Sequence, residues 1–207
     1  MKSRSLIIAV TLIPTASVWS EASAQRKGLV DVSPDHFRRG VWLEAGLGWG
    51  QESFKFADDP YSDQLGKPTF NFAVGGTPKS WIRLGGEATV WVNSYQDSGD
   101  EGSFNVTETL SNVMAVARVY PIRSAGLFLK AGMGLGVSNV AVQYGDGVTE
   151  TGFATSLGAG YEIQLSKKLF FTPKVEWFQQ SYQARGDDTL YERLANLSLS
   201  VTFQPGR

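Results

Sequence analysis

Cysteine is absent from the 207 residues, and histidine occurs once, as His36. The chain therefore has no disulfide framework, no thiolate metal site and no cysteine nucleophile. A single histidine also severely limits histidine-based catalysis and histidine-rich metal sites. Nor is there an excess of basic residues, because 19 Lys and Arg face 20 Asp and Glu. No positive field indicates a nucleic-acid partner.

Long uncharged hydrophobic runs are also missing, which excludes a helical membrane bundle, since each span needs about 18 or more such residues. The chain is nevertheless 42% hydrophobic and 12% aromatic, too rich in these residues for a disordered protein. Glycine is unusually abundant at 23 residues, about 11% against a usual share of about 7%.

The first residues have the pattern of a secretory signal peptide. Lys2 and Arg4 precede a short apolar run over 6–13, and Ala22-Ser23-Ala24 supplies the small residues of a cleavage site. We expect cleavage before Gln25. The predicted organisation is a signal peptide over 1–24, a periplasmic lead-in over 25–39, a barrel over 40–204 and a tail over 205–207.

From Gly40 onward apolar and polar residues alternate with a period of two, which indicates β-strands and no helix. The connections between strands alternate between tight turns and longer loops rich in Gly and Asp, the pattern of an up-and-down meander. The pattern predicts eight strands, over 40–51, 68–76, 80–95, 104–121, 126–143, 150–165, 168–182 and 190–204.

The contents of the two strand faces indicate which one meets lipid. In the fifth predicted strand, Leu129, Met133 and Leu135 share one face, and Lys130 lies with glycines on the other. A crowded interior needs small residues, so the glycine face points inward and the apolar face points into hydrocarbon. Closure is then required, because an open sheet edge in lipid leaves backbone groups unpaired. We predict an all-β, eight-stranded antiparallel transmembrane β-barrel.

The inward face carries four acidic and four basic residues. Buried charges are tolerable when they are paired and hydrogen-bonded, so we expect a salt-bridge network in the lumen rather than a paired acid–base site. The expected members are Glu44, Arg83, Glu87, Arg118, Lys130, Glu162, Lys174 and Glu176.

Two further expectations concern single residue types. Aromatic residues gather near both ends of the strands, which resembles the girdles of outer-membrane barrels. The expected girdle residues include Trp42, Trp49, Trp81, Trp91, Tyr95, Tyr120, Phe128, Tyr144, Phe170, Trp177, Tyr182 and Phe203. Pro173 lies within a strand and cannot donate to the ladder, so we expect a β-bulge there.

These features resemble the bacterial outer membrane protein β-barrel domain family, the small eight-stranded barrels that include the OmpA membrane domain and OmpX. The resemblance runs from about Gly40 to Phe203. It is most marked in Val119-Tyr120-Pro121 with the following Gly126–Gly136 strand, and in Gly158–Glu162. It implies an outer-membrane location, contact with lipid and lipopolysaccharide, and recognition of the final strand, which ends at Phe203, by the barrel assembly machinery.

The predicted function is a structural or surface-interaction role as a monomer, without enzymatic activity, cofactor, bound metal or large pore. Two alternatives remain open: a lipid-modifying barrel enzyme, for which His36 is the only histidine, and a secreted lipocalin-like barrel. We also expect an acidic surface-loop cluster, read as a solvated rim, although carboxylates can take divalent cations. Its residues are Asp58, Asp59, Asp97, Asp100, Glu101, Asp187 and Asp188.

Overall fold

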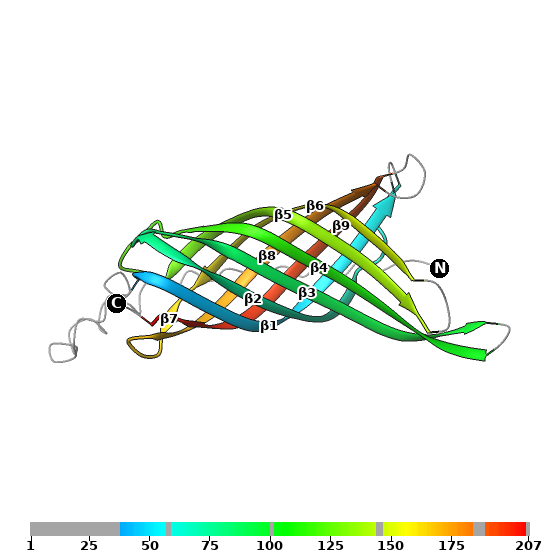
Figure 1. Cartoon of the computed structure of the whole chain (residues 1–207), viewed down its shortest axis with the longest axis horizontal. Helices are drawn as coiled ribbons and strands as arrows, with labels where there is room; N and C mark the ends of the chain where they lie inside the picture. The colour runs from blue at the N-terminus through cyan, green and yellow to red at the C-terminus, as the bar shows by residue number, and fades with distance from the viewer. Residues whose placement is uncertain (1–37, 57–58, 100–101, 144–146, 184–188, 206–207) are drawn as a thin grey trace, which may run out of the picture. The chain divides into compact units, whose positions relative to one another are not determined.

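The computed structural model describes residues 38–56, 59–99, 102–143, 147–183 and 189–205, all within one compact unit. They form a single antiparallel sheet (Figure 1). Its strands are β1 (Gly40–Phe56), β2 (Leu65–Lys79), β3 (Ile82–Gly99), β4 (Gly102–Val119), β5 (Leu127–Val142), β6 (Val148–Tyr161), β7 (Ile163–Gln164), β8 (Leu169–Gln183) and β9 (Thr189–Phe203). No helix in this part of the chain is long and apolar enough to cross a membrane.

The sheet closes on itself as a barrel with eight strand positions, here called staves; each stave is one strand, except the sixth, which consists of β6 and β7. The first strand pairs with both β2 and β9, and β6 pairs with both β5 and β8. Strand β7 continues the stave of β6 after a break at Glu162. The predicted eight-stranded antiparallel barrel is therefore confirmed, with one stave divided into two segments.

The break in the sixth stave lies opposite Pro173. The β6–β8 ladder runs to Gly160↔Lys174 and resumes as Ile163↔Phe171, three residues further along both strands. The register is unchanged, so the predicted β-bulge is wrong. Because proline has no N–H to donate, the ladder is interrupted instead. The Glu162 N–H donates to the Gly126 carbonyl oxygen at 2.9 Å.

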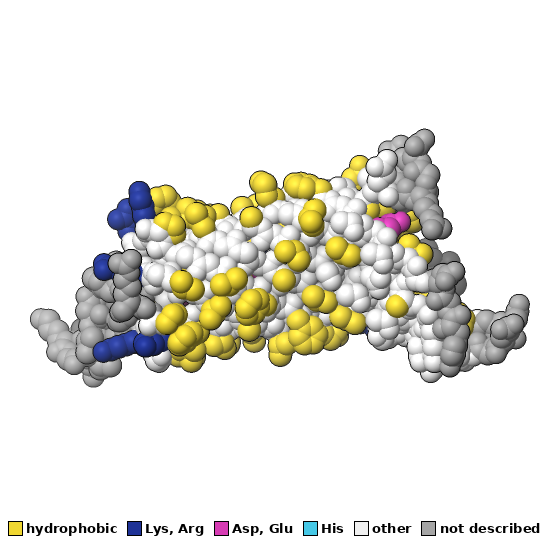
Figure 2. Space-filling view, viewed as in Figure 1, with side chains coloured by type: hydrophobic (Ala, Val, Ile, Leu, Met, Phe, Trp, Pro, Cys, Tyr) yellow, Lys and Arg dark blue, Asp and Glu magenta, His cyan; other side chains and the backbone are white. Residues whose placement is uncertain are grey.

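The outer face is apolar over the middle of the barrel, as predicted. Leu129, Met133 and Leu135 are more than half exposed, and hydrophobic side chains are spread over the face of the barrel that Figure 2 shows. On β1, β8 and β9 this apolar belt ends just beyond Trp49 and Trp177. The next outward positions are Gln51, Gln179 and Arg193, which are polar. Inward residues at or beyond that level lie outside the membrane-spanning part of the strands.

Half of the expected girdle aromatics lie inside the barrel. Trp42, Trp91, Tyr120, Phe128, Phe170 and Tyr182 are buried in the lumen, whereas Trp49, Trp177 and Phe203 face outward. The girdle prediction is wrong for the six buried aromatics. It rested on position along a strand, whereas alternation decides the face: Trp42 lies two residues before Glu44 and so points inward as Glu44 does. Trp91 and Tyr182 join an internal apolar cluster with Leu110, Met114, Phe178 and Leu194. Tyr144 lies outside the described residues.

One predicted loop is largely strand. Residues 96–103 were expected to connect the third and fourth strands, but β3 and β4 continue through this region and pair as far as Gly99↔Gly102. The two strands project beyond their neighbours as a ribbon (Figure 1). A ribbon with solvent on both faces needs no apolar alternation, so the sequence pattern ended too early.

Candidate functional site

The middle of the lumen is crossed by a central ion-pair network of Glu44, Glu87, Glu176, Arg118, Lys130 and Lys174. The six side chains come from β1, β3, β4, β5 and β8 and are essentially inaccessible to solvent. Glu44 accepts from Arg118 at 2.5 and 2.9 Å and from Lys174 at 2.9 Å. Lys130 joins Glu87 to Glu176. Three carboxylates thus face three bases, which makes the network formally neutral.

The network is supported by neutral partners and by aromatic rings. The Thr202 hydroxyl donates to Glu44 at 2.9 Å, and the Asn196 side-chain amide donates to Glu176 at 3.4 Å. The Arg118 guanidinium carbon lies 4.7 Å from the centre of the Trp42 ring. Stacking and charge-assisted hydrogen bonds compensate the loss of hydration that burial imposes on these ions.

A second cluster, the lower seal, lies toward the end with the short turns. Its centre is Glu162, which accepts from Arg38 at 3.2 Å, from the Tyr120 hydroxyl at 2.7 Å and from Arg83. Arg83 also donates to the Gln204 side-chain oxygen at 2.6 Å. Arg38 lies over the Tyr120 ring at 3.9 Å and donates to the Arg123 carbonyl oxygen at 3.0 Å.

All eight charged residues expected in the lumen are buried and take part in these two clusters, six in the network and two in the seal. Sequence reasoning missed Arg38, which was assigned to the lead-in, and Gln204, placed at the very end of the barrel. A signal was present. Arg38 shares the even parity of Trp42 and Glu44, and Gln204 shares that of Thr202.

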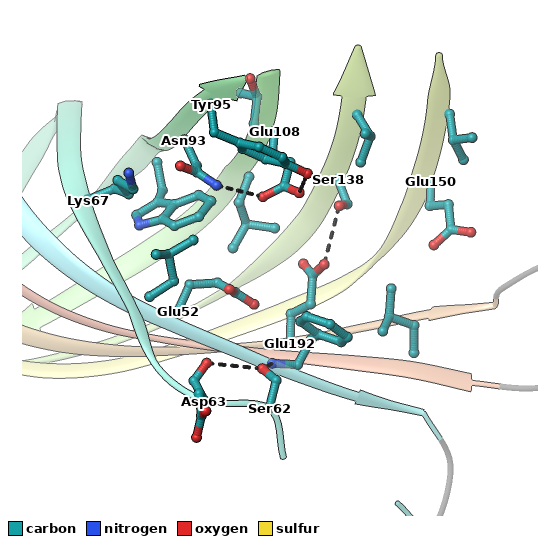
Figure 3. Close-up of a pocket in the computed structure, with 18 of the residues that line it drawn as sticks. Glu52, Ser62, Asp63, Lys67, Asn93, Tyr95, Glu108, Ser138, Glu150 and Glu192 are labelled. Atoms are coloured by element: carbon teal, nitrogen blue, oxygen red, sulfur yellow. Dashed lines mark hydrogen bonds between the residues drawn. The ribbon is translucent and has the colours of Figure 1, made fainter. Parts of the chain in front are cut away.

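A cavity of about 730 Å³ opens at the end with the long loops (Figure 3). This mouth cavity contains four glutamates on four staves: Glu52 on β1, Glu108 on β4, Glu150 on β6 and Glu192 on β9. The Glu108 carboxylate accepts from the Asn93 amide at 2.9 Å and from the Tyr95 hydroxyl at 3.0 Å. Glu192 accepts from the Ser138 hydroxyl at 3.2 Å.

Two mouth carboxyls have raised pKa values. Both carboxyls lie beyond the apolar belt. Glu52 and Glu192 are each within one residue pair of Arg193, the polar residue that faces outward where the belt has ended. Burial, with the nearby charges of Glu192 and Glu108, raises the pKa of Glu52 to about 8. Burial also raises the pKa of Glu192 to about 7, although the nearby Tyr182 and Ser138 hydroxyls oppose the rise, and the Glu150 charge adds to it. Unlike the network acids, these two have no basic partner among the described residues.

The expected acidic surface-loop cluster is only partly described. Asp59 and Asp97 are both exposed, but Asp59 lies between β1 and β2 whereas Asp97 lies on the extension of β3. Asp58, Asp100, Glu101, Asp187 and Asp188 lie outside the described residues, as do His36 and the predicted signal peptide over 1–24. The acidic site that the structure assembles is the mouth cavity. Its members Glu52 and Glu192 share the inward parity of Glu44 and Asn196, the signal that would have found them.

A closed antiparallel barrel with an apolar outer belt and a polar, charged lumen defines the class of outer-membrane β-barrel proteins. The chain belongs to the outer membrane protein beta-barrel domain family, whose pattern matches residues 16–203. It is an outer-membrane protein, and the secreted lipocalin-like alternative is excluded. None of the curated protein sequences matches the chain.

Solved structures of outer-membrane barrels are similar in fold. Neisserial surface protein A is 11% identical with a TM-score of 0.54, over 80% of this chain and 97% of that one. Ail of Yersinia pestis is 10% identical with a TM-score of 0.46, over 78% and 99%. OprG of Pseudomonas aeruginosa is 10% identical with a TM-score of 0.46, over 81% and 98%.

Proposed function

We propose that this protein is a non-enzymatic outer-membrane barrel with a structural or surface-interaction role and not a large pore. The observation that carries the proposal is the central ion-pair network, which links five staves across the lumen. An eight-stranded barrel has an interior just wide enough to be filled by side chains. The apolar cluster around Trp91, Met114 and Phe178 fills the lumen further toward the mouth.

Conductance measurements test the closed lumen. Reconstituted in planar bilayers, the mature protein should give no large steady channels, with a general porin in the same membranes as the positive control. Large steady channels from the parent protein would overturn this part of the proposal.

A comparison of membrane lipids tests the absence of enzymatic activity. Lipid profiles of cells with and without the protein should match in acyl-chain number and headgroup modification. A protein-dependent change would favour the lipid-modifying alternative instead.

The proposal places the protein as a monomer among outer-membrane lipid and lipopolysaccharide. Its apolar belt suits lipid on all sides, and basic side chains gather at the short-turn end (Figure 2). We propose that the barrel assembly machinery recognises the final strand, which ends at Phe203. Analytical ultracentrifugation in density-matched detergent should give the mass of one chain, and a stable dimer would contradict the proposal of a monomer.

A further inference from the structure

The mouth cavity differs from the rest of the lumen in its charge balance. In the central network every carboxylate contacts at least one base. Glu52 is only 9% exposed, yet it has no hydrogen bond or ion pair among the described residues. Glu192 is 8% exposed, and its Oε2 atom has no hydrogen-bond partner there. Buried carboxylates without partners are costly, so this arrangement favours a cation supplied from outside.

The walls of the cavity indicate what kind of cation fits. Apolar and aromatic side chains lie between the carboxylates, and Lys67 is the one base among the described lining residues. Trp91 is held in place because its indole N–H donates to the Gly50 carbonyl oxygen at 3.1 Å. Aromatic faces attract ammonium groups. The apolar wall is formed by Phe54, Leu65, Leu110, Val140, Val148 and Leu190.

The positions of the carboxylates favour a ligand with separated charges. Glu52, Glu108 and Glu192 point into one space from different staves, with apolar side chains among them (Figure 3). A divalent metal ion needs several oxygen ligands converging at about 2.0–2.6 Å. A flexible organic chain instead can place ammonium groups at separate carboxylates and its methylenes against the apolar wall. The cavity size is within the usual range for small-molecule sites, about 300–1,000 Å³.

We infer that the mouth cavity binds a small organic polycation, a linear aliphatic diamine or polyamine, with Glu52 and Glu192 as its principal anionic partners. The site is distinct from the closed lumen of the proposed function. The two proposals can therefore fail separately: a barrel that conducts ions could still bind the polyamine, and a closed barrel could fail to bind it.

Binding should strengthen as pH rises, because the two principal carboxyls must lose their protons to pair with ammonium groups. The raised pKa values of Glu52 and Glu192, about 8 and about 7, put this change between pH 6 and 9. The other titratable groups that face or adjoin them are Asp63, Lys67, Tyr95, Glu108, Glu150 and Tyr182.

The test uses the full mature protein in zwitterionic detergent, with spermidine as the probe and isothermal calorimetry as the readout at pH 6 and pH 8.5. We expect saturable binding that is tighter at pH 8.5. The doubly substituted Glu52→Gln, Glu192→Gln protein should bind at least about tenfold more weakly, the factor expected for losing one hydrogen bond to a charged group. The matched control, Asp59→Asn with Asp97→Asn, removes the same charge outside the cavity and should bind like the parent.

Three results would overturn the inference: no saturable binding by the parent, equal weakening in both variants, or competition by Mg²⁺ at the same concentration as spermidine. Near-ultraviolet circular dichroism of each variant shows whether it is folded. Replacing repelling carboxylates with amides of the same shape should leave the barrel intact.

Discussion

At the scale of single residues, Glu44 is the most heavily contacted acid of the central network. Two bases and one hydroxyl converge on its two oxygens. Glu44→Gln would leave three bases facing two carboxylates, so the network would carry one uncompensated positive charge in the membrane interior. We expect the free energy of unfolding in detergent, measured by urea titration, to fall by about 3 kcal/mol, the lower end for breaking a buried pair.

Glu108→Gln is the matched control for that substitution. Its carboxylate accepts hydrogen bonds from Asn93 and Tyr95, and no ion pair involves it among the described residues. The amide can keep one acceptor oxygen, so this variant should unfold close to the parent. Equal urea midpoints for Glu44→Gln and the parent would show that the network does not stabilise the barrel.

Gly134 tests how tightly the lumen is packed. A Cβ added there would overlap the Val113 carbonyl oxygen and lie 2.6 Å from the Met114 Cα, both of them backbone atoms. At Gly86, by comparison, the nearest atom would be 3.9 Å away. Overpacking costs about 1–3 kcal/mol, so Gly134→Ala should lower the unfolding free energy by this amount and Gly86→Ala should not. Thermal denaturation of the two variants side by side decides the matter.

At the scale of strands, β5 shows how depth in the membrane sets the cost of a charge. Met133 is 62% exposed on the lipid face near the middle of the strand, and Leu127 begins the strand at the short-turn rim. Arginine on a barrel costs about 2–4 kcal/mol at the bilayer midplane and about 0–1 near the interface. Met133→Arg should therefore impair folding into lipid vesicles more than Leu127→Arg, as read from band shifts on unheated gels. Equal impairment would argue against the assigned depth.

The same strand explains why so much of the fold could be predicted. Its period of two, with Lys130 among glycines, fixes both the strand and its orientation, and Leu129, Met133 and Leu135 face outward as expected. Alternation of apolar and polar residues cannot reveal a ribbon whose two faces are both polar, which is why the extension of β3 and β4 was not predicted. It also cannot show that the ladder is interrupted opposite Pro173, since this depends on which neighbour needs the missing N–H.

The candidate site was predictable in membership but not in pairing. Parity puts the eight charges in one lumen, whereas their division into a network and a seal depends on heights along the axis that only the pairing register sets. Glu108, Glu150 and Glu192 lie within predicted strands but were left out of the inward set, whereas Arg38 and Glu52 lie just outside the first predicted strand, 40–51. Extending the even parity of β1 in both directions, to Arg38 and to Glu52, would have included them.

At the scale of the whole molecule, the charges are arranged in layers along the barrel axis. The short-turn rim is basic (Figure 2), the central network is formally neutral, and the mouth cavity is acidic. The acidic layer makes stability depend on pH. In the unfolded chain Glu titrates near about 4.3, whereas the pKa values of Glu52 and Glu192 are raised in the folded protein to about 8 and about 7. Their contribution is fully present below the unfolded value and is lost as pH rises through the folded values.

We therefore expect the urea concentration at the unfolding midpoint of the parent to decrease as the pH is raised from 5 to 8.5, without added polyamine. The variant with Glu52→Gln and Glu192→Gln should show a flatter profile over the same interval, because the titrating groups are gone. A parent profile that rises with pH, or one that the double substitution leaves unchanged, would refute this account of the mouth.

The lower seal constrains the order in which the barrel is assembled. The Gln204 side chain donates to the Arg39 carbonyl oxygen, across 165 residues of sequence, and Glu162 meets Arg38 across 124. These contacts need β1 and β9 to be neighbours already, and bringing distant segments together carries an entropic cost that is met before such contacts form. Sealing is thus a late event that locks the seam between the first and last strands. A chain halted before closure would expose both an unpaired sheet edge and an open base.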